Sequence, residues 1–401
     1  MPKNPAIDPT RIRSAMPVFK DGYLNNAAAS LMSHTVVDAV TAHLALESAL
    51  GPYEAAMEVA DHLADLYEVA SQLLGCQPDE IALSDSHSRG WSSVVGAMRF
   101  GAGDRILVSR SEWGGNYAAL VHIARICGAV LEVIPCGEDG TVCVERLAAM
   151  IDDRVRLIAL TWLPANGGLI NPAAQVGALA QAAGIPFILD AAQAVGQIPV
   201  DVRELRCDVL TAPGRKWLRG PRGTGLIYVR RAFLDKLTPR TIDLYSAPWN
   251  GTEYVLRGDA RRFETSEASA ALRLGLRAAI RDVLSLGVDT IHCRIASLAD
   301  AIRSSLAAID GVQVHDLGRQ RSGLVSFAVE SVTPAEVRRL LQAADLQVAV
   351  IPTDFTPLDM RARGLKEIVR ASPHIYTTQN EIDRLAATVA DIAMQSNNSR
   401  A

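Results

Sequence analysis

A glycine-rich loop carries one of the few lysines in this chain of 401 residues. Only five of the 40 basic residues are lysines, and Lys216 lies in a run, residues 212–225, that contains four glycines and follows a strand-like segment. A lysine presented on such a turn is what a Schiff base with an aldehyde cofactor requires. A surface lysine in a glycine loop would give the same pattern, so the loop alone leaves both readings open.

An acidic residue follows the strand-like segment one before the strand that leads into this loop. The apolar residues 186–189 are followed directly by Asp190. In a parallel α/β sheet the carboxyl ends of the strands face the crevice where ligands bind. A carboxylate there can keep the ring nitrogen of pyridoxal phosphate protonated, so that the ring accepts electrons from a substrate carbanion. An aspartate that only caps the next turn is the alternative, but the acid and the lysine together are more specific than either alone.

The elements that would position these residues alternate between short β-type runs and stretches of helical period. From about Tyr23 this alternation indicates βαβ units on a largely parallel sheet. The strands expected in it are residues 81–84, 105–108, 130–134, 157–161, 186–189, 209–211 and 225–229, and clear helices are 90–100, 117–127 and 172–183.

The pattern changes after residue 262 to long helices with few strands. We expect helices over 267–285, 287–309 and 380–394, and strands over 312–315 and 324–329. The fold class is therefore α/β, with a seven-stranded, mostly parallel sheet in a large domain and a smaller C-terminal α+β domain. The predicted division is an N-terminal arm over 1–22 that joins the small domain, a large cofactor-binding domain over 23–262 and a small domain over 263–401.

Composition excludes several classes of protein. With 49% hydrophobic and 21% charged residues, the chain is neither disordered, collagen-like nor a coiled coil. A net charge of -4 gives no case for nucleic acid or an anionic membrane as partner. The six cysteines form no CxxC pair, so we expect no metal site and reduced thiols in a cytoplasmic protein. No secretory signal and no apolar run of about 20 residues is found.

Three short motifs together resemble the class V aminotransferase family, whose members are fold-type I enzymes that use pyridoxal 5'-phosphate. The motifs are Asp-Ala-Ala-Gln at 190–193, Gly-Arg-Lys-Trp at 214–217 and Gly-Pro-Arg-Gly at 220–223. The resemblance covers nearly the whole chain, from residues 23–28 to residues 369–376. It implies pyridoxal 5'-phosphate as cofactor, an amino acid as substrate, and a homodimer whose active site lies at the subunit interface, with residues 257–265 as the candidate segment that reaches the neighbouring subunit.

The resemblance also implies roles for single residues. Lys216 matches the Schiff-base lysine, Asp190 the partner of the pyridine nitrogen, and Gln193 the ligand of the phenolic oxygen. Trp113 matches the aromatic residue that stacks on the ring, where many relatives have histidine, and Arg370 matches the arginine that grips the substrate carboxylate. The other matches are Ser88, with His87 nearby, for the phosphate, Asn166, Arg215 and Thr265 for the cofactor, and Asn26, Ala27, His374 and Tyr376 for the substrate.

Plain structural readings exist for several of these residues. Ser88 could be a helix cap, Trp113 a core residue, and Asn166 the first residue of an Asn-Gly turn. The chain also departs from its relatives. Arg215 replaces a histidine before the lysine and favours the neutral amine of Lys216, Thr265 is only a candidate for the phosphate threonine supplied by the partner subunit, and residues 348–369 lack the nucleophilic cysteine of desulfurases.

Cofactor-binding residues do not decide the reaction, because one site can support transamination, racemisation, β-elimination or decarboxylation. Residues 215–223 and 166–172 are most similar to the isopenicillin N epimerase-like branch. That branch includes lyases of S-substituted cysteines in ergothioneine formation and in thiol-conjugate steps of antibiotic pathways. Our hypothesis is a β-eliminating carbon–sulfur lyase that acts on an S-substituted L-cysteine conjugate. An aminotransferase, an amino-acid epimerase and a catalytically silent protein with a cofactor-binding fold are the alternatives.

Overall fold

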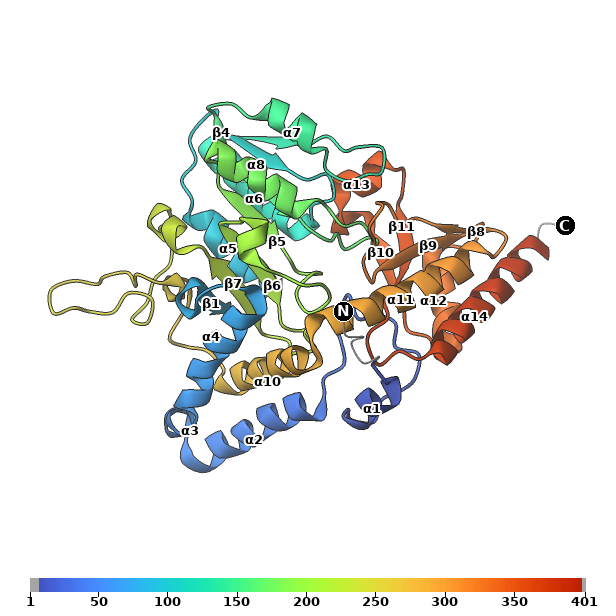
Figure 1. The fold of residues 1–401 in the computed structure, drawn as a ribbon, viewed down its shortest axis with the longest axis horizontal. Helices are drawn as coiled ribbons and strands as arrows, with labels where there is room; N and C mark the ends of the chain where they lie inside the picture. The colour runs from blue at the N-terminus through green and yellow to red at the C-terminus, as the bar shows by residue number, and fades with distance from the viewer. Residues whose placement is uncertain (1–6, 399–401) are drawn as a thin grey trace, which may run out of the picture.

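The computed structural model describes residues 7–398 and contains two β-sheets, each covered by helices (Figure 1). The larger sheet has seven strands in the order β1-β7-β6-β5-β4-β2-β3. Neighbouring strands from β6 to β3 are parallel, whereas β7 is antiparallel to both β6 and β1. The strands are β1 (Ile81–Ser84), β2 (Arg105–Val108), β3 (Val130–Val133), β4 (Val155–Thr161), β5 (Phe187–Asp190), β6 (Val209–Pro213) and β7 (Gly225–Val229).

The smaller sheet is antiparallel, with the order β10-β11-β9-β8. Its strands are β8 (Val312–Val314), β9 (Val325–Val329), β10 (Ala349–Pro352) and β11 (Glu367–Ala371). The predicted fold class is confirmed, and every strand expected from the sequence is present with its ends shifted by two residues or fewer. The outermost residues of the predicted arm and small domain, 1–6 and 399–401, lie outside the described residues.

Helices cover both faces of the large sheet, because each strand sends alternate apolar side chains to opposite faces. On one face Trp91 and Val94 of α5 (His87–Ala97) and Leu120 of α6 (Gly114–Cys127) share a buried apolar cluster with Ile106 of β2. The other face is covered by α4 (Ala60–Leu74) and α8 (Ala173–Ala183). The ends of α8 are as predicted, since Pro172 precedes its first turn and Gly184 ends it with a left-handed φ of 67°.

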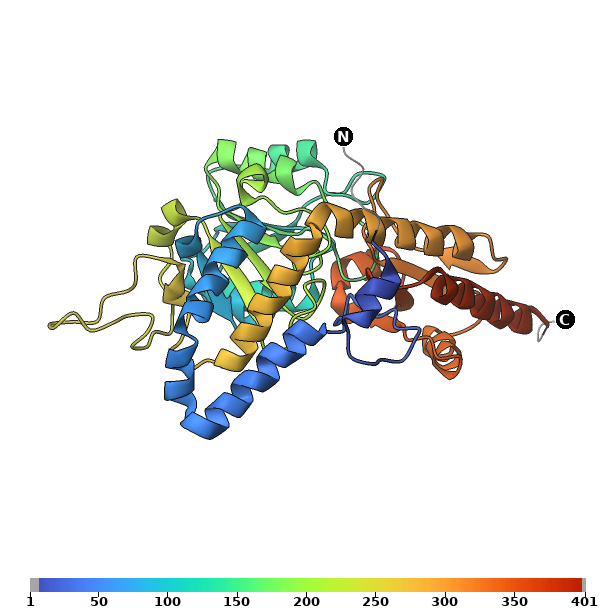
Figure 2. The ribbon, with the colours of Figure 1, turned by 60° about the horizontal axis from the view of Figure 1, so that its bottom comes forward.

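Two consecutive long helices connect the two cores. The first, α10 (Ala270–Leu286), packs against α4 and against α2 (His34–Leu50), as Figure 2 shows, and its buried side chains join the core of the large sheet. The second, α11 (Val288–Ala307), joins the core of the small sheet together with α12 (Pro334–Ala343) and α14 (Gln379–Asn398). The division between the large domain and the small domain at residues 262 and 263 stays a prediction. The remaining helices are α1 (Pro9–Ser14), α3 (Pro52–Glu58), α7 (Val144–Met150), α9 (Val202–Leu205) and α13 (Pro357–Ala362), with 3₁₀ turns η1 (Pro78–Glu80), η2 (Arg231–Lys236), η3 (Ala260–Phe263) and η4 (Thr353–Phe355).

A long loop between η2 and η3 projects away from the body of the molecule (Figure 1). It carries exposed apolar side chains, and the rings of Trp249 and Tyr254 meet edge to face with centroids 5.0 Å apart. The exposed apolar residues of the loop are Ile242, Leu244, Trp249, Tyr254 and Val255. None of the described helices is both long enough and apolar enough to cross a membrane.

Candidate active site

The carboxyl ends of three parallel strands open onto a cavity of about 250 Å³. Thr161 ends β4, Asp190 ends β5, and the loop after β6 supplies Lys216. The first turn of α5 closes the opposite side. Of the residues predicted for the site, this cavity brings together His87, Ser88, Trp113, Asp190, Gln193, Arg215 and Lys216.

Lys216 is partly buried and opens onto the cavity. The pKa of its amine is lowered to about 7, first by burial and then by the positive charges of Arg215 and Arg370, while Asp190 opposes the shift. The predicted effect of Arg215 on Lys216 therefore has the expected direction. An amine with a pKa of about 7 is half uncharged at neutral pH, which is the form that attacks an aldehyde and accepts a proton.

Asp190 is buried, accepts two hydrogen bonds and lies beside a histidine. Its Oδ1 accepts the backbone N–H of Ala192 at 2.8 Å and lies 2.9 Å from Nε2 of His87, and its Oδ2 accepts Nδ2 of Asn116 at 2.7 Å. Burial acts to raise the pKa of Asp190, but His87, the hydrogen bonds and Lys216 outweigh burial and lower it. The structure thus holds an ionised carboxylate across the cavity from an amine.

His87 and Trp113 lie together above this carboxylate. Their ring centroids are 5.8 Å apart in an edge-to-face arrangement, and His87 also stacks on Trp91. We expected His87 near the phosphate site, whereas the structure turns its Nε2 toward Asp190. Trp113 stands just before α6 and lines the cavity, so a flat aromatic surface faces the space beside Asp190.

The amino end of α5 offers an anion site. Ser86 caps this helix by accepting the N–H of Arg89 at 3.2 Å, which leaves Ser88 to line the cavity. A side chain at Gly225 would be crowded, because its Cβ would meet Oγ of Ser84 at 2.8 Å and the backbone of Ser86 and His87 at 3.0 and 3.2 Å. Helix N-terminal amides and nearby Arg215 suit a phosphate group.

Arg370, on β11 of the small sheet, is a buried cation without an acidic partner among the described residues. Its Nη1 donates to the carbonyl of Ala165 at 2.6 Å, and Ala165 lines the cavity. Its Nε is buried and makes no hydrogen bond. Burial, and then the charge of Arg215, lower its pKa to about 10. A buried, unpaired guanidinium fits a carboxylate that a ligand brings.

The structure brings together an amine for a Schiff base, a carboxylate for the ring nitrogen, an aromatic surface for the ring, and sites for two anions, a phosphate and a carboxylate. Together these features fit pyridoxal 5'-phosphate and an amino acid. A family model described as "Aminotransferase class-V" matches residues 22–385. The chain belongs to this family. It is accordingly an enzyme that depends on pyridoxal 5'-phosphate.

Relatives of this class V chain cover nearly its full length. A probable cysteine desulfurase of Methanothermobacter thermautotrophicus is 27% identical over 95% of this chain and 97% of its own. A probable hercynylcysteine sulfoxide lyase of Mycobacterium tuberculosis is 29% identical over 96% of this chain and 94% of its own. The solved structure of an Escherichia coli cysteine desulfurase has the same fold, with a TM-score of 0.89 at 22% identity over 98% of this chain and 99% of that one.

Asn26 and Ala27, which are also predicted for the class V site, lie around the cavity without lining it, and Gln193 connects them to it. Gln193, which does line it, donates to the carbonyl of Ala27 at 3.0 Å and accepts the indole N–H of Trp217 at 2.7 Å. Asn26 donates to the carbonyl of Ser372 at 2.8 Å, and the Ala27 N–H donates to the Ser372 hydroxyl at 3.0 Å. These bonds tie the N-terminal segment to the end of β11.

His374 and Tyr376 are buried in an aromatic stack with Trp217. The imidazole is parallel to the Tyr376 ring within 6°, with centroids 5.3 Å apart, and burial lowers the pKa of His374 to about 3. The Tyr376 hydroxyl donates to Asn26. Trp217 directly follows Lys216, so the stack packs against one end of the lysine loop and can hold it in place.

Asn166 and Thr265 occupy two different places. Asn166 is buried beside Ala165, and its Nδ2 donates to Oδ2 of Asp359 at 2.8 Å. Thr265 is exposed at a neighbouring cavity, which it shares with Gly223 and Thr224 of the lysine loop. Sequence reasoning missed Asn116, which binds Asp190, and Glu112, which binds Asn116.

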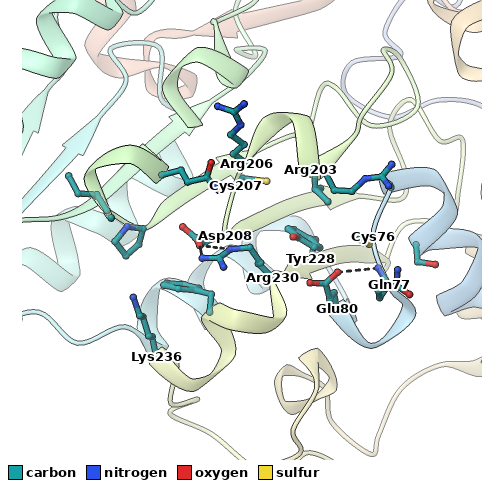
Figure 3. A pocket seen from close by; sticks show the side chains of 18 of the residues that line it. Cys76, Gln77, Glu80, Arg203, Arg206, Cys207, Asp208, Tyr228, Arg230 and Lys236 are labelled. Atoms are coloured by element: carbon teal, nitrogen blue, oxygen red, sulfur yellow. Dashed lines mark hydrogen bonds and ion pairs between the residues drawn. The ribbon is translucent and has the colours of Figure 1, made fainter. Parts of the chain in front are cut away.

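A second cavity of about 520 Å³ lies at the opposite end of the strands of the large sheet, beside the start of β6 (Figure 3). It is lined by Cys76 and Cys207 and by basic side chains, of which Arg230 pairs with Asp208. Burial raises the pKa of the Cys76 thiol to about 12 and raises that of Cys207 as well. Both are therefore thiols at neutral pH and poor nucleophiles. No cysteine is among the described residues that line the first cavity.

Proposed function

We propose that this class V enzyme is a β-eliminating carbon–sulfur lyase of S-substituted L-cysteine conjugates. The overall reaction converts one conjugate and one water into a thiol, pyruvate and ammonium, as the carbon–sulfur bond breaks and the sulfur leaves with the bonding electron pair. Bound pyridoxal 5'-phosphate supplies the electron sink that makes the α-proton of an amino acid acidic.

Residues of the chain carry out the remaining parts of the reaction, and each has a separate role. Lys216, with a pKa of about 7, takes up the α-proton as a neutral amine. Arg370 holds the substrate carboxylate, because its buried guanidinium has unused donors. When the cofactor is bound, Asp190 would pair with its ring nitrogen and Trp113 would cover its ring, while the amino end of α5, Ser88 and Arg215, which line the same cavity, would hold its phosphate.

The observation that carries the choice of reaction is the segment between β10 and β11, which contains no cysteine. Asp359 of α13 fastens this segment to the rest of the site, because its carboxylate accepts from Asn166 at 2.8 Å and from Arg363 at 3.1 Å and lies 3.3 Å from Arg110 Nε. Asp354 is in direct contact with Gly114, where a Cβ would meet its carbonyl oxygen at 1.9 Å. A fixed segment without a thiol offers no nucleophile to take up the sulfur, so the sulfur leaves with its substituent, and the similarity to a probable hercynylcysteine sulfoxide lyase supports this reading.

We also propose that the enzyme acts as a homodimer in the cytoplasm. The exposed apolar residues of the loop between η2 and η3 support a subunit contact, and that loop leads into residues 257–265. Thr265 lies beside the lysine loop but outside the cavity, which suits a residue that completes the site of a neighbouring subunit. All six cysteines are free, which supports a reducing compartment.

Absorption spectra and product assays test the proposal. Purified protein is loaded with pyridoxal 5'-phosphate and mixed with S-alkyl-L-cysteines and their sulfoxides, and pyruvate and ammonium are measured. We expect both products in equal amounts over many turnovers, and none from Lys216→Ala, whereas Lys236→Ala retains activity. A reaction that stops after one turnover and resumes only when a keto acid is added would instead identify an aminotransferase.

A further inference from the structure

A second buried carboxyl group lies behind Asp190. Glu112, in the loop between β2 and α6, has no exposed surface. Its Oε1 accepts Nδ2 of Asn116 at 3.0 Å and the hydroxyl of Thr161 at 2.8 Å, and its Oε2 accepts the hydroxyl of Ser109 at 3.0 Å. Three donors directed at two carboxyl oxygens are the surroundings of an ionised side chain.

Asn116 connects Glu112 to the cavity. The nitrogen that donates to Glu112 also donates to Oδ2 of Asp190 at 2.7 Å, so one amide group bridges the two carboxyl groups. Turned the other way, the amide would place its oxygen against two acceptors. The bridge therefore fixes the orientation of Asp190 only while Glu112 is in place to receive the other N–H.

Thr161 connects Glu112 to the aromatic face of the site. It ends β4 and is paired in register with Asp190 of β5. Its hydroxyl donates to Glu112 and accepts the backbone N–H of Trp113 at 3.2 Å. Glu112 thus contacts the supports of both walls of the cavity, although it does not line the cavity itself.

We propose that Glu112 is a positioning residue for the cofactor ring: through Asn116 and Thr161 it holds Asp190 and Trp113 in place, and its negative charge favours a protonated ring nitrogen. The proposal rests on the roles proposed above for Asp190 and Trp113, but it does not depend on which reaction follows.

The charge of Glu112 changes in the neutral range. Burial, and then the charge of Asp190, raise the pKa of Glu112 to about 7, while its three hydrogen bonds act to lower it. The other charged or titratable groups near the pair are His87 of α5, which faces Asp190, and Lys216 of the loop after β6. Above this pKa Glu112 adds a second negative charge behind the ring nitrogen site, and below it the site loses that charge.

Glu112→Gln tests the role, because the amide keeps the size of the side chain and one acceptor oxygen but removes the charge. We would measure the dissociation constants of the apoenzyme for pyridoxal 5'-phosphate and for its 1-deaza analogue, in which a C–H replaces the ring nitrogen, from the quenching of tryptophan fluorescence at pH 8. The variant should bind pyridoxal 5'-phosphate about tenfold more weakly, a factor that corresponds to about 1.4 kcal/mol. Its affinity for the analogue should not change, because the analogue has no ring proton to favour.

Glu264→Gln is the matched control. Glu264 is also a buried carboxyl, but its partners are Tyr67, the backbone of Leu83 and Arg273, away from Asn116 and Asp190. We expect this change to lower the melting temperature without altering the ratio of the two dissociation constants.

Two outcomes would overturn the proposal. Equal weakening of both compounds by Glu112→Gln would show a role in stability alone, and unchanged binding of both by a folded variant would show no role. The lyase proposal fails separately, when the wild-type protein binds both compounds with the expected ratio but releases no pyruvate from any cysteine conjugate.

Discussion

The charge state of Lys216 depends on the arginine beside it, and this dependence can be measured. Burial and two arginines move the pKa of the amine from 10.5 to about 7. At pH 7 about half of the amine is then neutral, whereas an amine with a pKa of 10.5 would be neutral in only about one molecule in 3,000. The surroundings therefore raise the supply of reactive amine by about three orders of magnitude.

Replacing Arg215 by glutamine removes the second-largest cause of this shift. A nearby positive charge disfavours the ammonium form, so its removal must raise the pKa of Lys216, by about one unit for a charge at short range. The neutral fraction at pH 7 then falls from about one half to about one tenth, and reactions of the amine slow about fivefold. Arg215→Lys retains the charge and should leave the pKa close to the wild-type value.

The assay is the rate at which apoenzyme reacts with pyridoxal, which lacks the phosphate, as a function of pH. Because Arg215 is also proposed to bind phosphate, the pH midpoint is compared and not the absolute rate. The midpoint should move upward in Arg215→Gln, and Arg222→Gln, at an exposed arginine, should leave it unchanged. A midpoint that stays in place or moves downward in Arg215→Gln would refute the electrostatic reasoning.

Three further changes have outcomes that the structure determines. Arg370→Leu should lower kcat/KM for a cysteine conjugate by a factor of about 30 or more, since a buried charge-assisted pair is worth about 2–5 kcal/mol; a normal kcat/KM in steady-state kinetics would show that another group holds the carboxylate. Gly225→Ala should weaken cofactor binding, because its Cβ would meet the backbone of Ser86 and His87; equilibrium dialysis measures the affinity, and wild-type affinity would exclude α5 as the phosphate site. Asp359→Asn should lower the free energy of unfolding by about 1–3 kcal/mol, since it weakens hydrogen bonds to Asn166 and Arg363; urea denaturation measures this loss, and an unchanged midpoint would show that α13 is held by other contacts.

The sequence predicts those site residues whose position follows from local pattern. Asp190 ends a continuous apolar strand and Lys216 follows the next one, so the sheet brings both to one edge. Helices and strands whose apolar residues recur at a regular spacing are predictable for the same reason, because their position follows from local pattern. The prediction omits the helices α2 and α4, which pack against α10, although the buried Leu66, Val69 and Leu73 of α4 have helical spacing.

The residues that were missed depend on contacts between distant segments. Glu112 and Asn116 are polar residues of a loop and of a helix start, and nothing in their neighbourhood shows that Thr161 and Asp190 will enclose them. His374 and Tyr376 were predicted at the substrate, but the stack on Trp217 that buries them joins segments more than 150 residues apart. Family resemblance transfers a position along the chain, whereas the direction of a side chain is decided by its packing.

The order of strands in the large sheet also sets the order in which the site can be assembled during synthesis. β1 is an edge strand, and its only neighbour in the sheet is β7, which is the last strand of that sheet to be made. The helix α5, whose amino end we propose as the phosphate site, directly follows β1. A chain that is still emerging from the ribosome therefore carries β1 unpaired until residue 229 has appeared. The nascent enzyme cannot complete its cofactor site early, so capture of pyridoxal 5'-phosphate follows closure of the sheet, and any truncation upstream of β7 abolishes it.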